Sequence, residues 1–404
     1  MSTPTTTLTE QQARRNVVVC AATSCIGFTG FTLVMPFLPL YISQLGVTDV
    51  GQIAMWTGLT LGATPAVTAV SAPLWGRVGD RYGSKLLVIR SLGAFVLTKA
   101  AMAFVTAPWQ LFALRALLGL FAGYGALTVS MAAESVPRDR MPWAIGFVQT
   151  GQRFGPAIGP VLGGLLAPVL GIRRAFLAAS AFYLLAVAIV WFLYREPRAR
   201  GRAAAAGRGT RAVFVELVRA PGFVLLLAVI LALQVVDRSF APVLPLYVAE
   251  LGVPVGRVAT VAGLLFSLGA IAAAFGHHLA GRLLRVHAAR TVIAAAAVAG
   301  SAAMAVVALA PPVWVVGAAI AASGVTIGVG MTAAYAAAGA LLPADAHATG
   351  FGFMTTASLV GLAVSPVLAG FVGAASLRVV FVLDVVLLLA LAAVVSRRPA
   401  RDAP

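Results

Sequence analysis

The sequence predicts an all-α membrane protein whose twelve transmembrane helices form two pseudo-symmetric six-helix bundles, and three observations lead to this prediction. Of the 404 residues, 61% are hydrophobic and only 10% are charged, which is more apolar surface than a soluble domain of this length can bury. Apolar runs of about 20 residues, enough to cross the hydrocarbon of a bilayer, alternate with short polar breaks. A pattern in the first half of the chain also returns in the second half.

The apolar runs predict six helices in each half. Those of the first half are 16–43, 52–75, 86–106, 109–134, 141–168 and 173–194. Those of the second half are 222–249, 257–280, 290–310, 312–341, 347–373 and 377–396. The intervening segment is rich in Arg, Ala and Gly, which is typical of a mobile linker. We therefore expect an N-terminal bundle at 1–194, a cytoplasmic linker at 195–221 and a C-terminal bundle at 222–404.

The distribution of basic residues predicts the orientation of the chain. Of the 29 Lys and Arg residues, 21 fall on the side of the two termini, four fall on the other side and four fall inside predicted spans. Short loops rich in Lys and Arg are retained in the cytoplasm. We expect a multi-pass plasma (inner) membrane protein with both termini cytoplasmic. Because the basic residues form no face with interleaved aromatics, the charge of +17 does not indicate a nucleic-acid partner.

Two pieces of sequence reveal an internal duplication. The stretch MPFLPLYISQLGV, from Met35, returns as APVLPLYVAELGV, from Ala241, 206 positions later. The stretch GPVLGG, from Gly159, returns as SPVLAG, from Ser365, at the same offset. Repeats of this kind characterise secondary transporters, whose substrate sites lie near the bilayer midplane between the repeats.

Four motifs carry a family resemblance. They are VMPFLPLY at 34–41, GRVGDRYGSK at 76–85, RALLGLFAG at 115–123 and GQRFGPAIGPVLGG at 151–164. With these motifs the chain resembles the major facilitator superfamily, specifically the twelve-span drug/proton antiporter branch of the multidrug-resistance efflux type. Ser84 stands where the loop motif usually has Arg, and the second-half counterpart, GRLLRVHAAR from Gly281, has lost the acid.

The loop motif is expected to be a cytoplasmic turn between the second and third spans. The resemblance implies that it acts as a conformational switch through Gly76, Asp80, Arg81, Gly83 and Lys85. An acid among bases at a helix end can accept from backbone N–H groups of a neighbouring helix. The resemblance implies such a contact from Asp80 to the eleventh span, made in the outward-facing shape. The alternative is that Asp80 only balances charge in a basic anchor.

The fifth span holds the antiporter motif of the family. Its members are Gly155, Pro156, Gly159, Pro160, Gly163 and Gly164. Glycines let helix backbones approach closely, and each proline bends the helix and frees a carbonyl. The resemblance implies packing against the eighth span that seals the substrate path, and the alternative is a generic small-residue interface.

Ionisable residues inside spans are costly and indicate function. Asp237 is the first candidate for a proton-coupling group, and Arg153, near the midplane of its span, is a second. A structural ion pair between them is the alternative. Asp237 and Arg238 point about 100° apart on an ideal helix, so we expect separate partners for them. The family motif implies a coupling role for Arg115, and the alternative is a structural role in which it donates hydrogen bonds to freed backbone carbonyls. Glu134 is a further candidate, and its alternative is a solvated helix end.

Other intramembrane and aromatic residues complete the expectations. Lys99 and Asp384 belong to helices that the family places at the periphery, so we expect structural roles for them. The candidates for a substrate cavity are Phe31, Met35, Arg153, Asp237, Phe240 and Tyr335.

The expected function is proton-coupled efflux of small amphipathic compounds or drugs by alternating access. No nucleotide-binding loop, nucleophile motif or metal-ligand spacing occurs in the sequence, so we expect neither an enzyme nor a cofactor or metal. The expected partners are a small-molecule substrate, protons and the bilayer, with the protein acting as a monomer. Export or import of a single metabolite or sugar is an alternative, and a membrane scaffold or sensor without transport is a second.

Overall fold

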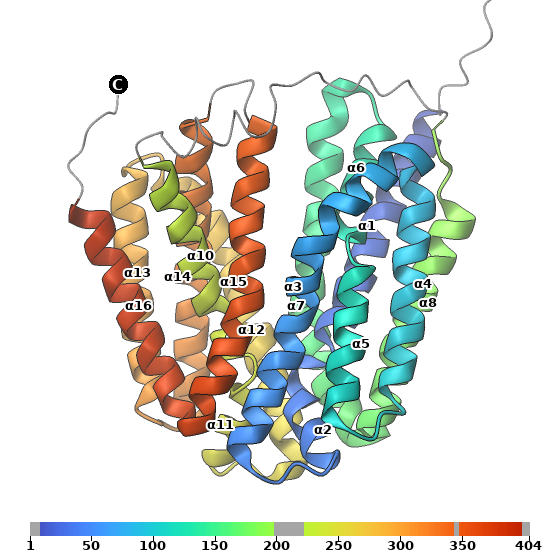
Figure 1. Cartoon of the computed structure of the whole chain (residues 1–404). Helices are drawn as coiled ribbons and strands as arrows, with labels where there is room; N and C mark the ends of the chain where they lie inside the picture. The colour runs from blue at the N-terminus through green and yellow to red at the C-terminus, as the bar shows by residue number, and fades with distance from the viewer. Residues whose placement is uncertain (1–8, 198–221, 343–346, 398–404) are drawn as a thin grey trace, which may run out of the picture.

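The computed structural model describes residues 9–197, 222–342 and 347–397, without the side chains of residues 72–74, 76–82, 138, 347 and 348. The described residues form helices joined by short turns. Figure 1 shows these helices as two bundles that lie side by side and meet at the lower end of the view. Most of the predicted linker, 198–221, lies outside the described residues.

The helices of the N-terminal half follow the six predicted spans. Their bounds are α1 Glu10–Thr32, η1 Met35–Phe37, α2 Leu38–Gln44, α3 Val50–Tyr82, α4 Ser84–Met102, α5 Pro108–Leu120, α6 Tyr124–Glu134, η2 Arg138–Arg140, α7 Met141–Leu170 and α8 Ile172–Leu193.

The helices of the C-terminal half repeat this arrangement. Their bounds are α10 Phe223–Ser239, α11 Leu244–Glu250, α12 Val255–Leu283, α13 Ala289–Ala308, α14 Val313–Ala340, α15 His347–Ala375 and α16 Leu377–Arg397.

Among the described residues, ten helices or helix runs are long and apolar enough to cross a membrane, and the bent pair α10–α11 makes an eleventh. Helix α4 occupies the place of the third predicted span. It carries Lys85, Arg90 and Lys99 within 19 residues, and it packs against α5, α6 and α8 inside the N-terminal bundle. Together these segments match the twelve predicted spans in order, which confirms the predicted fold class.

Three of the predicted helices are interrupted, although the sequence analysis expected them to be continuous. The first span breaks between α1 and α2, and the seventh bends by 44° between α10 and α11. Pro36 and Pro242 stand at equivalent places in these two breaks, and a proline has no N–H to continue the helical hydrogen bonds. The fourth span breaks at Gly123, whose φ of +124° favours glycine.

The loop motif also differs from the predicted turn. Helix α3 continues through most of it to Tyr82, and α4 begins at Ser84. The turn is reduced to Gly83, whose φ of +87° lies in the region that favours glycine. Lys85 then donates from Nζ to the backbone oxygen of Tyr194 at 2.8 Å, which ties the start of α4 to the end of α8.

Two tyrosines at equivalent positions anchor the two broken helices. The hydroxyl of Tyr41 donates to the backbone oxygen of Met102 at 2.7 Å, and that of Tyr247 donates to the backbone oxygen of Val307 at 2.5 Å. Both tyrosines are fully buried. Each bond satisfies a carbonyl near the end of α4 or α13, so each half holds its broken helix in the same way.

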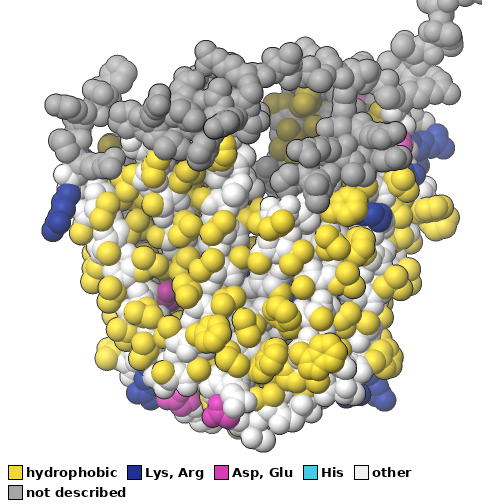
Figure 2. Space-filling model, viewed as in Figure 1, with side chains coloured by type: hydrophobic (Ala, Val, Ile, Leu, Met, Phe, Trp, Pro, Cys, Tyr) yellow, Lys and Arg dark blue, Asp and Glu magenta, His cyan; other side chains and the backbone are white. Residues whose placement is uncertain are grey.

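The outer surface has the distribution expected of a protein surrounded by lipid. In Figure 2 hydrophobic side chains cover the middle of the visible face, and Lys, Arg, Asp and Glu lie mainly at its lower end and upper sides. Leu97, Val169, Phe192 and Trp314 each expose more than 70% of their surface. In water such a surface would be an aggregation hazard, whereas in a bilayer it contacts acyl chains.

Candidate functional site

Glycines let the helix backbones of the two halves approach each other closely. A Cβ added at Gly51 would lie 2.7 Å from the backbone oxygen of Ala374, and one at Gly58 would collide with that of Pro366. These contacts join the beginning of α3 to the end of α15. Because α1 begins, and α16 ends, at the opposite side of the molecule, the halves pack tightly at the end away from the termini (Figure 1).

A second pair of helices joins the halves at the same end. Helix α7 packs against α12, where a Cβ added at Gly164 would lie 2.5 Å from the backbone oxygen of Ala259. Thr260 donates from Oγ1 to the backbone oxygen of Gly164 at 2.8 Å. The N–H of Val161 donates to Oγ of Ser267 at 3.2 Å, a hydrogen bond that crosses between the halves.

The other glycines of the antiporter motif face α1. A Cβ added at Gly155 or Gly159 would collide with α1, and one at Gly163 would collide with Leu33 directly after α1. The hydroxyl of Thr32 in α1 donates to the backbone oxygen of Gly155 at 3.2 Å. Helix α7 therefore lies between α1 of its own half and α12 of the other half. Pro156 and Pro160 occur inside it and break its hydrogen-bond ladder where it borders the cavity described next.

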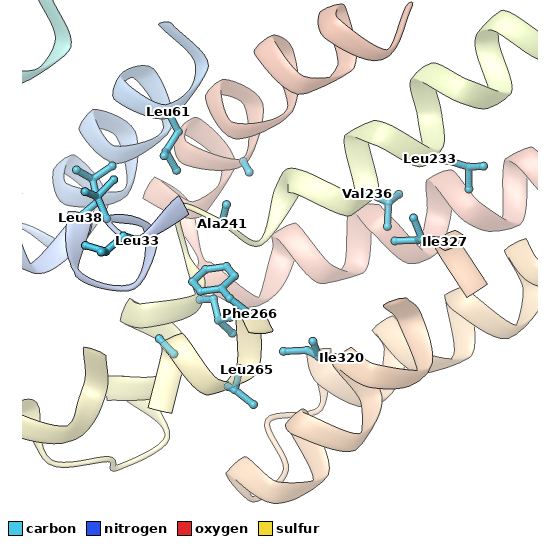
Figure 3. Close-up of a cluster of buried hydrophobic side chains, with 14 of the residues drawn as sticks. Leu33, Leu38, Leu61, Leu233, Val236, Ala241, Leu265, Phe266, Ile320 and Ile327 are labelled. Atoms are coloured by element: carbon cyan, nitrogen blue, oxygen red, sulfur yellow. The ribbon is translucent and has the colours of Figure 1, made fainter. Parts of the chain in front are cut away.

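A cavity of about 240 Å³ lies between the halves. The N-terminal half contributes side chains from α1, η1 and α7 to its wall, and the C-terminal half contributes side chains from α10, α12, α13 and α14. Figure 3 shows apolar side chains of both halves, among them Leu33 and Leu61 of the first and Ala241 and Phe266 of the second. Ala241 and Phe266 also border the cavity, so its wall merges with the apolar core between the halves.

Four of the six predicted cavity residues line this space. They are Met35, Arg153, Asp237 and Phe240. Phe31 and Tyr335 are not among its lining residues. Phe31 instead lies inside the N-terminal bundle, with its ring centroid 5.8 Å from Cζ of Arg115.

The acid of the cavity is paired with its sequence neighbour, contrary to the expectation of separate partners. Asp237 Oδ2 lies 2.9 Å from Nε of Arg238. The Nε–H is not aimed at the carboxylate, so the contact is an ion pair without a hydrogen bond. The pair sits in the last turn of α10. Gln234 contacts the same oxygen from Nε2 at 3.5 Å and accepts from Oγ of Ser358 on α15 at 2.9 Å.

Arg153 stands on the opposite wall of the cavity. No carboxylate of the described residues lies within ion-pair distance of it, so the alternative of an Asp237–Arg153 pair does not hold in this state. His277 of α12 also lines the cavity, with Nδ1 2.8 Å from Oγ1 of Thr332. No histidine is among the site residues predicted from the sequence. Its helix runs on to Leu283, so His277 lies more than one turn inside.

The remaining coupling candidates lie away from the cavity. Arg115 is fully buried inside the N-terminal bundle. Glu134 is exposed at the end of α6, where it accepts from Oγ of Ser130 at 3.0 Å. In the switch loop, Gly76, Asp80 and Arg81 belong to α3, but the structure does not describe their side chains.

Two residues expected to be structural are deeply buried. Lys99 is 0% exposed and Asp384 is 3% exposed. Ser239, the last residue of α10, contacts Asp384 Oδ2 from Oγ at 2.5 Å. Asp384 is thereby joined to the helix that carries the cavity acid.

Comparisons with known proteins agree with this architecture. The sequence profile of the Major Facilitator Superfamily matches residues 20–320 and 255–404. Multidrug resistance protein MdtG of Yersinia enterocolitica is 35% identical over 270 residues, which are 67% of this chain and 65% of that protein. MdtG of Escherichia coli is 34% identical over 67% of this chain and 66% of that protein. The match thus spans slightly less than two thirds of these relatives' own length.

Solved structures share the fold across nearly the whole chain. A bacterial homolog of the human lysosomal transporter Spinster, in an inward-facing and unoccupied conformation, has a TM-score of 0.78 at 16% identity and covers 96% of this chain and 98% of its own. The nucleoside transporter NupG has a TM-score of 0.70 at 14% identity and covers 94% of this chain and 99% of its own. At these identities the likeness concerns the fold.

Proposed function

The chain belongs to the major facilitator superfamily, and on this premise we propose that it exports small amphipathic compounds in exchange for protons, by alternating access of its two halves to the two sides of the membrane. The observation that carries the proposal is the cavity between the halves, with Asp237 on one wall and Arg153 on the other. The likeness to the MdtG proteins, named for multidrug resistance, supports export of several compounds.

The cavity supports transport and not a chemical reaction on the substrate. Its wall is largely apolar, with a few polar groups that can orient a bound compound. A volume of about 240 Å³ fits a small molecule. The energy would come from the proton gradient, because Asp237 faces the cavity and can exchange a proton when water enters it.

The asymmetry of Lys and Arg supports cytoplasmic termini. In that orientation the tightly packed end faces outward, and the cavity belongs to an inward-facing state. Export then requires the α3–α15 and α7–α12 contacts to open while the opposite ends close. We propose that the loop containing Asp80 makes its switch contact in that second state, and that the protein works as a monomer.

Dye accumulation in cells tests this function. Cells that express the chain are expected to accumulate less of several amphipathic dyes, cationic, neutral and acidic, than cells without it. An uncoupler is expected to abolish the difference. Asp237→Asn is expected to lose efflux, whereas Glu250→Gln is the matched control, because Glu250 is an exposed acid paired with Arg378 at 3.0 Å, away from the cavity.

The results separate this proposal from its rivals. Efflux of one compound alone would indicate a single-metabolite exporter. Efflux that persists in the presence of an uncoupler would contradict proton coupling. Equal accumulation with and without the chain, for every dye, would point to a scaffold or sensor.

A further inference from the structure

Two cations lie side by side in the interior of the N-terminal half, away from the cavity. Lys99 of α4 is 0% exposed and Arg115 of α5 is 1% exposed. The ring of Phe31 on α1 lies against both, with its centroid 6.0 Å from Nζ of Lys99 and 5.8 Å from Cζ of Arg115. Neither Lys99 Nζ nor Nε and Nη2 of Arg115 has a hydrogen-bond partner among the described residues.

The surroundings of Lys99 contain no described acid. Phe176 of α8 lies 6.0 Å from Nζ, and the titratable groups nearby are the phenols Tyr183 of α8 and Tyr124 of α6, together with Arg115 of α5. The described side chains of α3, the fourth helix that packs against α4, include no titratable group in this region. The described acids of the N-terminal half are all exposed at helix ends; they are Glu10, Asp49, Glu134, Asp139 and Glu196.

The chemistry of the two side chains indicates which of them can lose its charge. Arginine keeps its proton in proteins, whereas a lysine amine can lose its proton when it is buried. Two adjacent charges with no counter-ion in a dry interior are strongly unfavourable. Of the two side chains, Lys99 is therefore the one that can exist as a neutral amine, with a lone pair available to a proton.

We infer that Lys99 is a second proton-binding residue, which is neutral in this state and takes a proton from water in another state of the cycle. A proton can bind to an amine inside a packed interior, whereas a larger ligand would need a cavity there. Phe31, whose ring lies against Lys99 and Arg115, directly precedes Thr32 in the cavity wall. Movement of this turn of α1 when the halves rearrange would admit water past the ring to the amine. The ammonium formed there would return its proton to water when the turn closes again.

This inference rests on the proposed proton-coupled export, because it assigns to Lys99 a share of the protons exchanged. It also explains why a lysine, and not a second arginine, stands beside Arg115. The two halves would then bind protons in different ways, with a carboxylate in the cavity of the C-terminal half and an amine behind Phe31 in the N-terminal half. At the offset of the internal repeat, Phe31 occupies the position equivalent to Asp237.

Nuclear magnetic resonance of the labelled side-chain amine measures the protonation of Lys99 directly. The chain contains two lysines, Lys85 and Lys99, so lysine labelled at Cε and Nζ gives two side-chain signals. The Lys99→Met variant assigns the pair by removing one of them. Lys85 serves as the internal control, because it lies at the start of α4, where it donates to backbone oxygens at the end of α8.

As the pH is lowered over the range in which the protein stays folded, the Lys99 signal is expected to change from that of an amine to that of an ammonium. An ammonium signal for Lys99 over the whole range would overturn the inference, and so would an amine signal that never titrates while the protein stays folded.

Transport measurements complete the test in proteoliposomes loaded with a pH indicator. Lys99→Met and Lys99→Gln, which cannot bind a proton, are expected to keep the fold and to lose part of the proton flux per compound exported. Unchanged flux in both variants would leave Lys99 with a purely structural role. The proposed function has its own test: it would be contradicted if the parent protein exported dye without any proton flux. The nuclear magnetic resonance spectrum of Lys99 does not depend on that result.

Discussion

Asp237 Oδ2 lies 2.9 Å from Nε of Arg238, and both side chains border the cavity between the halves. The pair stands in the last turn of α10, just before the chain bends toward α11. A proton on Asp237 would cancel the charge that holds Arg238. In the proposed mechanism, proton binding at Asp237, the charge of the cavity and the geometry of this bend would be linked at one point of the C-terminal half.

A double-mutant cycle measures this link. Arg238→Gln alone leaves the carboxylate of Asp237 without its cation, and Asp237→Asn alone leaves the arginine without its anion. Because each charge is costly when it is alone in a partly dry site, the double variant is expected to unfold at a higher temperature than either single variant. The expected coupling is on the order of 1 kcal/mol, since both side chains keep some exposure. Additive losses of stability would show that the two side chains do not interact.

The sequence was sufficient for the number and order of the helices, because length, hydropathy and the repeat at 206 positions act along the chain. The breaks were missed, although Pro36 and Pro242 lie at them, because apolar runs continue through both. The loop motif was expected as a turn because glycines and charges break hydropathy, yet backbone hydrogen bonding carries α3 on to Tyr82.

Predictions about the site were weaker, because they depended on where side chains point. Ideal helical geometry predicted separate partners for Asp237 and Arg238. An arginine side chain is long and flexible, however, and Arg238 at the helix end contacts the neighbouring carboxylate. Phe31 was assigned to the cavity and instead lies on Lys99 and Arg115. The environment of Lys99 emerges from contacts among α1, α4, α5 and α8, which no local sequence pattern records.

The α7–α12 contact is expected to control the balance between the two conformations. In Gly164→Ala the added methyl group would meet the backbone oxygen of Ala259 and Cα of Thr260, and neither can move without shifting α12. The variant is expected to weaken the closed contact by about 1–3 kcal/mol and to favour the state that is open at this end. Spin-label distances between the ends of α7 and α12 would measure the shift.

Gly146→Ala is the matched control for this experiment, since Gly146 lies in the same helix and an added Cβ there would have no neighbour within 4 Å. The control is expected to keep the parent's distance distribution. The same distribution in Gly164→Ala and in the parent would rule out this contact as the point that sets the balance.

Arg153 is expected to select for acidic groups on the substrate. It lines the cavity without a carboxylate within ion-pair distance among the described residues, whereas Arg238 is paired. Arg153→Gln should therefore weaken binding of an aromatic carboxylic acid by about tenfold and leave binding of the corresponding amide nearly unchanged, since a charged hydrogen bond contributes more than a neutral one. Competition against a bound fluorescent dye gives both affinities. An equal loss for acid and amide would assign Arg153 a role in the shape of the cavity and not in its charge.

The buried contact between Ser239 and Asp384 is expected to stabilise the C-terminal half. The two oxygens lie 2.5 Å apart, and Ser239 Oγ also lies 3.0 Å from the backbone oxygen of Val236. Ser239→Ala leaves the buried carboxyl without this partner and is expected to lower the free energy of unfolding by about 1–3 kcal/mol.

Replacing both groups, in Ser239→Ala with Asp384→Leu, should recover much of the loss, because no buried polar group is then left unsatisfied. Thermal unfolding of the purified variants compares them, and a double variant less stable than Ser239→Ala alone would show that Asp384 has further partners that hold it in place.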